Sequence, residues 1–445
     1  MAEVLEIESE RTMQDRLLLC LLALVPVLLS LAGVWILDHA KAEKPLFTVT
    51  NLVGPTTRSL LVGDGLTVCT EDMGTLGNPI CFHAARMPMT AVVMALGMRL
   101  FGDHYLRVAY FKTLLLLLPL ELAIYLVWRA LPSARGRRWL VAGLLLVPFG
   151  MTPFLADVTN ILVDEGYSYS LLALAVALLF FGWWWPPSLS GWVRVVLFAA
   201  CVDGLYLSKS GMLPVVLVLT AVLLFVEKGV TLRWLVVVLV AAAPMGWGLH
   251  QHHASGRYSM GTSLDGINLH KGNNAGFLKH YPPALGDSID RHDFELNRNL
   301  HFGDEWSFND YHLKAALEYW RTHPRETLEG DARKLNVLFF SFEKYGGTAS
   351  AGVGRLIETV GMVAFRLILW TAIVGAIYVL MRRKGLEFGR LRVASIAFLG
   401  VIAACVLPFV AGFAYTRHVS ILIYPAALFC CCLLCEPYNE RVMTG

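Results

Sequence analysis

The sequence predicts an all-α, polytopic membrane protein with about ten transmembrane helices. Hydrophobic residues make up 56% of its 445 residues and charged residues only 16%. The mean hydropathy of +0.57 is well above that of ordinary soluble domains. Apolar runs long enough to cross a bilayer recur along the chain, with short polar segments between them. The net charge of +3 is too small to favour a nucleic acid as partner.

The first apolar run, Leu17 to Leu37, is followed by no small-residue cleavage pattern, so we expect a span and not a removable signal peptide. The run from Met87 to Phe101 is only about fifteen residues long, which predicts a juxtamembrane helix that does not cross. The remaining spans are expected at 105–128, 139–155, 167–181, 193–207, 212–226, 232–248, 358–381, 391–412 and 419–434.

With this assignment, basic clusters around Arg137, Arg233 and Arg383 fall on the same side as the N-terminus. The positive-inside rule makes that side cytoplasmic. We therefore expect a protein of the inner (plasma) membrane, with both termini in the cytoplasm and the active site on the periplasmic or external face.

Three regions follow from the spans. Residues 1–249 form an N-terminal transmembrane module whose first external loop, 38–104, carries the chemistry, and residues 357–445 form the C-terminal transmembrane helices. Between them, 250–356 is a long external loop. Apolar residues recur there at helical spacing from Ser307 to Trp320, and Pro324 marks the first turn of a second helix. Both are predicted to be amphipathic helices on the membrane surface.

Two cysteines, Cys69 and Cys81, lie in the first external loop, where thiols would meet an oxidising compartment. A disulfide between them and a pair of free thiols are both open interpretations. The other cysteines are interpreted as small apolar residues, and the histidines of the long loop match no motif of defined metal geometry. No metal site is predicted from these residues.

Asp64 is the first candidate for catalysis. It lies between Gly63 and Gly65, a pattern typical of a tight turn. It is either a turn residue or a general base, which requires a carboxylate within hydrogen-bond reach of an acceptor hydroxyl. One carboxylate suffices when the leaving group is a phosphate, because that group departs as a stabilised anion and needs no acid of the kind glycosidases use.

The second external loop supplies a second acidic site. Asp157, Asp164 and Glu165 precede the span at 167–181. They are solvated acids, or they orient the acceptor, or they bind a divalent cation, and Glu165 is the strongest candidate. Basic residues near external span ends and in the long loop are candidates for binding a donor phosphate, against an alternative role at lipid headgroups: Arg86, Lys209, Lys271 and Arg417. His83 and Asn273 join Asp157 and Asp164 as candidate acceptor or cavity residues.

The order of these motifs resembles that of the GT-C polytopic glycosyltransferases, in particular bacterial proteins similar to dolichyl-phosphate-mannose protein mannosyltransferases and lipid A aminoarabinose transferases. The residues that carry the resemblance are Asp64, Arg86-Met87-Pro88, Leu100-Phe101-Gly102, Arg107, Glu165, Leu207-Ser208-Lys209, the loop 266–273, the helix 315–324 and the segment 417–425. Met87-Pro88 stands where the family has Pro-Pro, and the aromatic residue expected after the aspartate is absent.

The resemblance implies transfer of a hexosyl or pentosyl group from a polyprenyl-phosphate donor to a hydroxyl of a glycan, lipid or protein, with inversion. Asp64 would be the base, Glu165 would support the acceptor, and Arg86 with Lys209 or Arg417 would hold the phosphate. We expect Asp64, Glu165 and Arg86 to converge on one cavity. The alternatives are an enzyme similar to O-antigen ligases or polymerases, and a flippase or transporter of lipid-linked saccharides, although the sequence lacks paired discontinuous helices.

Overall fold

Helices account for almost all of the structure. The computed structural model describes residues 2–38, 53–70, 80–130, 135–150, 164–182, 190–281, 300–341, 353–382 and 389–442. Seven helices in these ranges are long and apolar enough to cross a membrane: Asp15–Ile36, Tyr105–Arg129, Gly191–Ser208, Val230–Ser255, Thr359–Met381, Gly389–Ala411 and Arg417–Leu434. Shorter apolar helices are Met89–Phe101, Arg138–Phe149, Glu165–Phe181 and Ser210–Val226. The predicted all-α, polytopic fold class is confirmed.

In chain order, the apolar segments belong to α1 (Ala2–Asp38), α4 (Met89–Phe101), α5 (Tyr105–Arg129), α6 (Arg135–Leu146), α8 (Glu165–Ala177), α9 (Gly191–Ser208), α10 (Leu213–Val226), α11 (Val230–Ser255), α17 (Val353–Met381), α18 (Gly389–Ala411), α19 (Arg417–Ser420) and α20 (Ile423–Val442). Each predicted span coincides with one of them, in the part of it that the structure describes. With 13 residues, α4 is only about 20 Å long, shorter than the ~30 Å hydrocarbon core.

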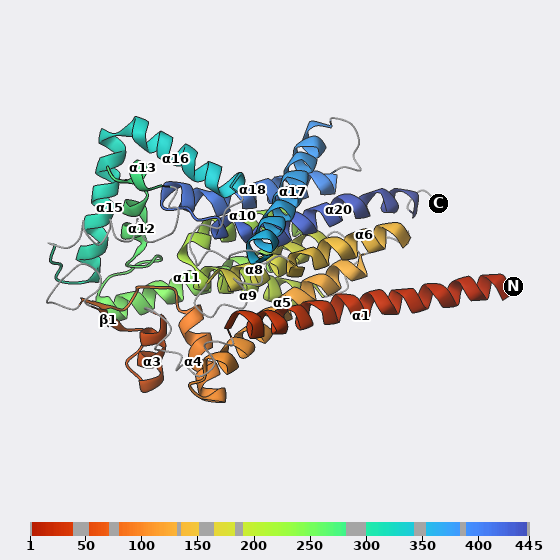
Figure 1. The fold of residues 1–445 in the computed structure, drawn as a ribbon, viewed down its shortest axis with the longest axis horizontal. Helices are drawn as coiled ribbons and strands as arrows, with labels where there is room; N and C mark the ends of the chain where they lie inside the picture. Colours follow the sequence, from red (N-terminus) through yellow and green to blue (C-terminus); the bar gives the residue numbers. More distant parts are fainter. Residues whose placement is uncertain are drawn as a thin grey trace.

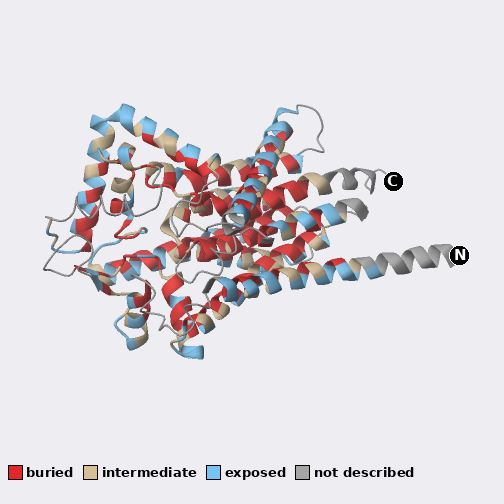
Figure 2. Cartoon of the chain, in the orientation of Figure 1, coloured by how far each residue is buried: buried red, intermediate tan, exposed pale blue. Residues whose placement is uncertain are grey.

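The helix α8 lies at the centre of the bundle. Its side chains are buried on almost every face, and it packs against α5, α9 and α20. A helix that is apolar all round belongs in an interior, and the small Ser and Ala side chains of α8 let its neighbours approach closely. Figure 2 shows the burial concentrated in these central helices, whereas the outer faces of α1 and α17 are exposed. This packing fixes the backbone position of Glu165, the first residue of α8.

The remaining elements gather at one end of the bundle, opposite the start of α1 and the end of α20 (Figure 1). They are α3 (Val53–Val62), β1 (Val68–Thr70), β2 (Ile80–Phe82), α12 (Asp265–Lys271), α13 (Phe277–His280), α15 (Glu305–Thr322) and α16 (Pro324–Phe339). α15 and α16 are the two predicted amphipathic helices. The Asp304 side chain caps α15 by accepting hydrogen bonds from the N–H groups of Trp306 and Ser307. The predicted limits of the long loop, 250 and 356, fall inside α11 and α17.

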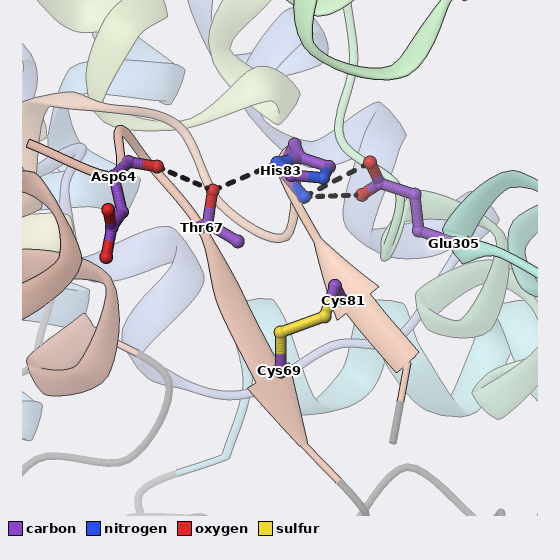
Figure 3. Close-up of a disulfide and its surroundings, with 6 residues drawn as sticks. All are labelled: Asp64, Thr67, Cys69, Cys81, His83 and Glu305. Carbon is purple, nitrogen blue, oxygen red and sulfur yellow. Dashed lines mark hydrogen bonds between the residues drawn. A yellow bond between two sulfur atoms is a disulfide. The ribbon is translucent and has the colours of Figure 1, made fainter. Parts of the chain in front are cut away.

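A two-stranded hairpin connects the first loop to this region. β1 and β2 are antiparallel, with Cys69 opposite Cys81, and a disulfide joins the two cysteines (Figure 3). After β2, the N–H groups of His83 and Ala84 both donate to the carboxylate of Glu305, at 3.1 Å. A carboxylate that accepts two backbone N–H groups is held firmly. The segment from residue 83 onward is therefore fixed to the start of α15.

Candidate active site

A cavity of about 970 Å³ lies between the central helices and the long loop. Its walls come from the segment 85–87, the start of α8, the junction of α9 and α10, the segment 260–271 with α12, and the chain from the end of α18 to α19. Within the described part of the chain, four cationic side chains line it: Arg86, Lys209, Lys271 and Arg417. Three carboxylates line it as well: Asp164, Glu165 and Asp265. The size is that of a small-molecule site.

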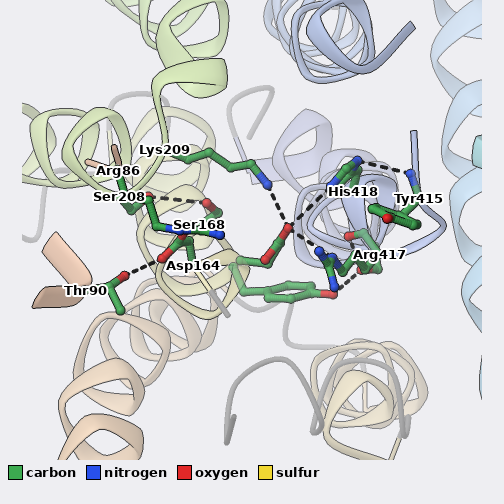
Figure 4. A network of polar contacts seen from close by, with 12 residues as sticks. Arg86, Thr90, Asp164, Ser168, Ser208, Lys209, Tyr415, Arg417 and His418 are labelled. Atoms are coloured by element: carbon green, nitrogen blue, oxygen red, sulfur yellow. Dashed lines mark hydrogen bonds and ion pairs between the residues drawn. The ribbon is translucent and has the colours of Figure 1, made fainter. Parts of the chain in front are cut away.

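Glu165 is the centre of one charged cluster. Its side chain is buried, with 4% of the residue exposed. Its Oε1 lies 2.7 Å from Lys209 Nζ, 3.5 Å from Arg417 Nε and 3.6 Å from His418 Nε2. Figure 4 shows Lys209 approaching from the end of α9, and Arg417 and His418 from α19. A buried carboxylate requires such partners, because an unpaired charge in a protein interior is strongly unfavourable.

The backbone presents Lys209 at a break between two helices. Lys209 ends α9 in an extended conformation (φ −159°, ψ 122°), a short 3₁₀ turn (Ser210–Met212) follows, and α10 begins beside Pro214. A cation at the C-terminus of a helix is favoured by the partial negative charge of the last carbonyl groups. Its Nζ also lies 5.0 Å from the centre of the Phe409 ring. The ammonium group is therefore held at the cavity wall.

His418 is fixed by Phe409 on α18 and by the segment that leads into α19. Its ring stacks on Phe409, with ring centres 4.0 Å apart. The backbone N–H of Tyr415 donates to His418 Nδ1 at 3.2 Å. Because Nδ1 accepts this bond, the neutral ring carries its hydrogen on Nε2, the nitrogen that faces Glu165.

A second charged pair also lines the cavity. Arg86 contacts Asp164 at 3.3 Å, and the hydroxyl of Thr90 donates to the other oxygen of the same carboxylate. Half of the Arg86 side chain is exposed, so the guanidinium still presents donors to the cavity. Arg86 follows two residues after Ala84, whose N–H binds Glu305, and Thr90 is in the first turn of α4.

The third carboxylate, Asp265, was not identified from the sequence. It accepts a hydrogen bond from Ser210 at 3.0 Å, and from the N–H and the hydroxyl of Thr262, both at 2.8 Å. Protein surrounds the carboxylate on most sides, but it is still accessible from the cavity. Burial raises the pKa of Asp265, and the three hydrogen bonds oppose this rise. The signal that would have found it is Thr262-x-x-Asp265, the pattern of an acid that binds a backbone N–H three residues earlier.

Asp64 lies elsewhere. It is exposed in the turn between α3 and β1, and among the described residues it does not line the cavity. Gly63 and Gly65 flank it with φ of 98° and 76°, and its carboxylate points away from Thr67 and His83 (Figure 3). The expected convergence of Asp64, Glu165 and Arg86 is therefore corrected: Glu165 and Arg86 line one cavity, and the left-handed turn directs Asp64 outward.

The other predicted residues divide in the same way. Lys271 lines the cavity. His83 is not among the described residues that line it, and its Nδ1 lies 3.0 Å from the hydroxyl of Thr67. Asn273 is buried, and its amide donates to the carbonyl groups of Leu269 and Ala411, which ties the end of α12 to α18. Asp157 falls outside the described residues. In the described ranges, no group of three His, Cys, Asp or Glu side chains has a geometry that would hold a metal ion.

The arrangement combines anion-binding groups with carboxylates beside apolar helices. Such a site can bind a phosphate on the cationic wall and act on a hydroxyl at a carboxylate. No protein-family model and no curated protein sequence matches the chain. Among solved structures, it is similar to the crystal structure of ArnT from Cupriavidus metallidurans in the apo state. The sequence identity is 14%, the match covers 87% of this chain and 72% of that chain, and the TM-score is 0.34. Because this TM-score is low, the function is inferred from the residues of the cavity and not from this similarity.

Proposed function

We propose that this protein is a membrane glycosyltransferase of the GT-C type. It would transfer a hexosyl or pentosyl group from a polyprenyl-phosphate donor to a hydroxyl of a glycan, lipid or protein. The observation that supports this proposal is the cavity of about 970 Å³, where four cationic side chains and three carboxylates meet next to apolar helices. A lipid-linked phosphate needs both parts of this environment, because its chain is apolar and its head is anionic.

In this proposal the cationic wall binds the donor phosphate. Lys209 and Arg417 share Glu165, and Arg86 shares Asp164, so each cation is already oriented before the donor arrives. Preorganised donors stabilise the charge that develops on a departing phosphate without reorganisation at the moment of reaction. Direct displacement at the anomeric carbon inverts its configuration. The positive-inside pattern supports a site on the external face of the plasma membrane and cytoplasmic termini.

The role of Asp64 as general base stays a prediction. Its exposed position outside the cavity argues for a different carboxylate, which is considered below. Glu165 is proposed to orient the acceptor side and the phosphate-binding cations together. The proposal does not require a divalent cation, because Asp164 and Glu165 already face cationic side chains of the protein.

A deletion strain tests the proposal. Its membrane lipids should accumulate one polyprenyl-phosphoryl sugar, and a surface glycan, lipid or protein should lack that sugar; the wild-type gene should restore both. A transporter of lipid-linked saccharides would instead move the donor with its phosphate ester intact. Purified protein in nanodiscs therefore separates the two: release of free polyprenyl phosphate together with a glycosylated acceptor supports transfer, and movement of uncleaved donor contradicts it.

A further inference from the structure

We propose that Asp265 is the catalytic base, the carboxylate that accepts the proton of the acceptor hydroxyl. The assignment rests on the proposed glycosyl transfer and deepens it, because it names the residue at which the acceptor binds. It follows from the partners of the three carboxylates in the cavity, from the geometry that holds Asp265, and from its place beside the phosphate-binding wall.

The three carboxylates differ in what neutralises them. Glu165 faces three basic side chains, and Asp164 faces Arg86. Within the described residues, the hydrogen bonds to Asp265 come from neutral donors alone. A carboxylate paired with cations is a weak base, whereas one surrounded by neutral groups retains its affinity for a proton. Asp265 is therefore the carboxylate of this cavity best suited to accept one.

Asp265 also has room for one more donor. A carboxylate accepts about four hydrogen bonds, two at each oxygen. Oδ1 receives the hydroxyl groups of Ser210 and Thr262, and Oδ2 receives the N–H of Thr262. One acceptor position on Oδ2 is left, on a residue that is exposed to the cavity. An acceptor hydroxyl fits that position.

The surroundings fix the direction of this carboxylate. A Cβ atom on Gly261 would lie 2.4 Å from Asp265 Oδ2, so only glycine leaves the oxygen its place. The next residue, Gly266, donates its N–H to Asn309 on α15 at 2.8 Å. Both contacts limit the movement of Asp265 relative to the rest of the cavity, which a general base requires for efficient transfer.

The base and the phosphate-binding wall share one turn of the chain. Lys209 contacts Glu165, and the adjacent residue, Ser210, donates to Asp265. In the proposed step, the acceptor oxygen forms a bond with the anomeric carbon as the bond from that carbon to the phosphate oxygen breaks. The electron pair of the broken bond leaves with the phosphate, and the acceptor proton passes to Asp265 Oδ2. Water later removes this proton.

The test uses the full-length protein in nanodiscs. Radiolabelled decaprenyl-phosphoryl arabinose, mannose and glucose are offered one at a time, with the lipids and surface glycans of a deletion strain as acceptors. Asp265→Asn should lower kcat by about 10²- to 10⁴-fold, the usual contribution of a general base. Its melting temperature should still rise with decaprenyl phosphate as in the wild type. The surface control Asp310→Asn, which pairs with Arg257 outside the cavity, should remain active. Asp64→Asn compares the two candidate bases and should keep transferring the sugar when Asp265 accepts the proton.

Two further variants separate a base from a structural residue. Sodium formate should partly restore transfer by Asp265→Ala, because it supplies the missing carboxylate. Ser210→Ala removes one stabilising donor from Asp265, so the acidic limb of its pH–rate profile should move to higher pH. Full activity of Asp265→Asn overturns the assignment of Asp265 as the base but leaves the proposed function standing. The same holds if Asp64→Asn is inactive and formate does not restore transfer by Asp265→Ala. A wild-type protein that transfers none of the three sugars and releases no decaprenyl phosphate overturns the proposed function with it.

Discussion

Lys209 Nζ lies 2.7 Å from Oε1 of Glu165, and this ion pair joins the end of α9 to the start of α8 at the cavity wall. Arg417 and His418 approach the same oxygen from α19. One buried carboxylate thus organises three basic side chains from two segments that are more than two hundred residues apart in the sequence. An anion entering the cavity meets cations whose positions are already set, which lowers the entropic cost of binding.

The first prediction concerns Lys209. Lys209→Met should weaken the binding of decaprenyl phosphate by about tenfold or more, because a charge-assisted hydrogen bond contributes about 1.5–3 kcal/mol. The variant should fold, since Glu165 keeps Arg417 and His418 as partners. Lys228→Met, at an exposed position between α10 and α11, is the matched control. Equal dissociation constants for both variants would remove Lys209 from the phosphate site.

The second prediction concerns the hairpin. The disulfide between Cys69 and Cys81 closes a segment with a sequence separation of 12 residues, and a loop of this length stabilises a fold by about 3 kcal/mol in the chain-entropy model. Replacing both cysteines by Ser should lower the melting temperature. It should also weaken decaprenyl phosphate binding, because the hairpin leads directly to Arg86. Cys20→Ser, at an exposed free thiol, should change neither, and a double variant that melts with the wild type would contradict the expectation.

Much of the architecture could be predicted because a transmembrane helix is determined by local sequence, namely the length and polarity of each apolar run. Glu165, Lys209 and Arg417 were also accessible to sequence analysis, since each stands at the end of an apolar segment where a charge is conspicuous. That reasoning places residues near a surface of the bundle. It says nothing about which of them meet.

The role of Asp265 could not be predicted in this way. Ser210 and Asp265 are separated by 55 residues, and their contact depends on how α12 packs against α15 and α18. The expectation that Asp64 lines the same cavity was wrong for a different reason. Its flanking glycines indicate a turn but not its direction, and in the structure both adopt positive φ and turn the side chain outward. The hydrophobic pattern specifies elements, whereas side-chain convergence is set by tertiary packing.

The third prediction is a dependence of stability on pH. Burial, followed by the charges of His270 and Lys271, lowers the pKa of His312 from 6.5 to about 3. The unfolded chain therefore binds more protons than the folded protein below about pH 6.5, and the free energy of unfolding falls as the pH decreases from there toward 3. The slope should reach about 1.4 kcal/mol per pH unit.

Melting temperatures in nanodiscs between pH 7.5 and pH 4.5 check this slope. His312→Gln should flatten it, although the variant will be less stable at neutral pH because His312 contacts His270 at 2.9 Å. His323→Gln, at an exposed position between α15 and α16, should keep the slope of the wild type. If His312→Gln and the wild type lose stability in parallel on acidification, the buried ring is not the source.

The last prediction concerns the contact between α12 and α18, on which the cavity depends. A Cβ atom on Gly272 would lie 1.7 Å from the carbonyl oxygen of Gly412, a distance at which one backbone must move. Gly272→Ala should therefore push α12 away from α18, break the hydrogen bond from Asn273 to Ala411 and displace Asp265 from Ser210. We expect a lower melting temperature and a loss of sugar transfer. Adding decaprenyl phosphate should restore neither of them. Gly303→Ala, where an added Cβ meets nothing within 4 Å, should be neutral; a Gly272→Ala protein that is equally active and stable would show that the two backbones can separate without harm to the site.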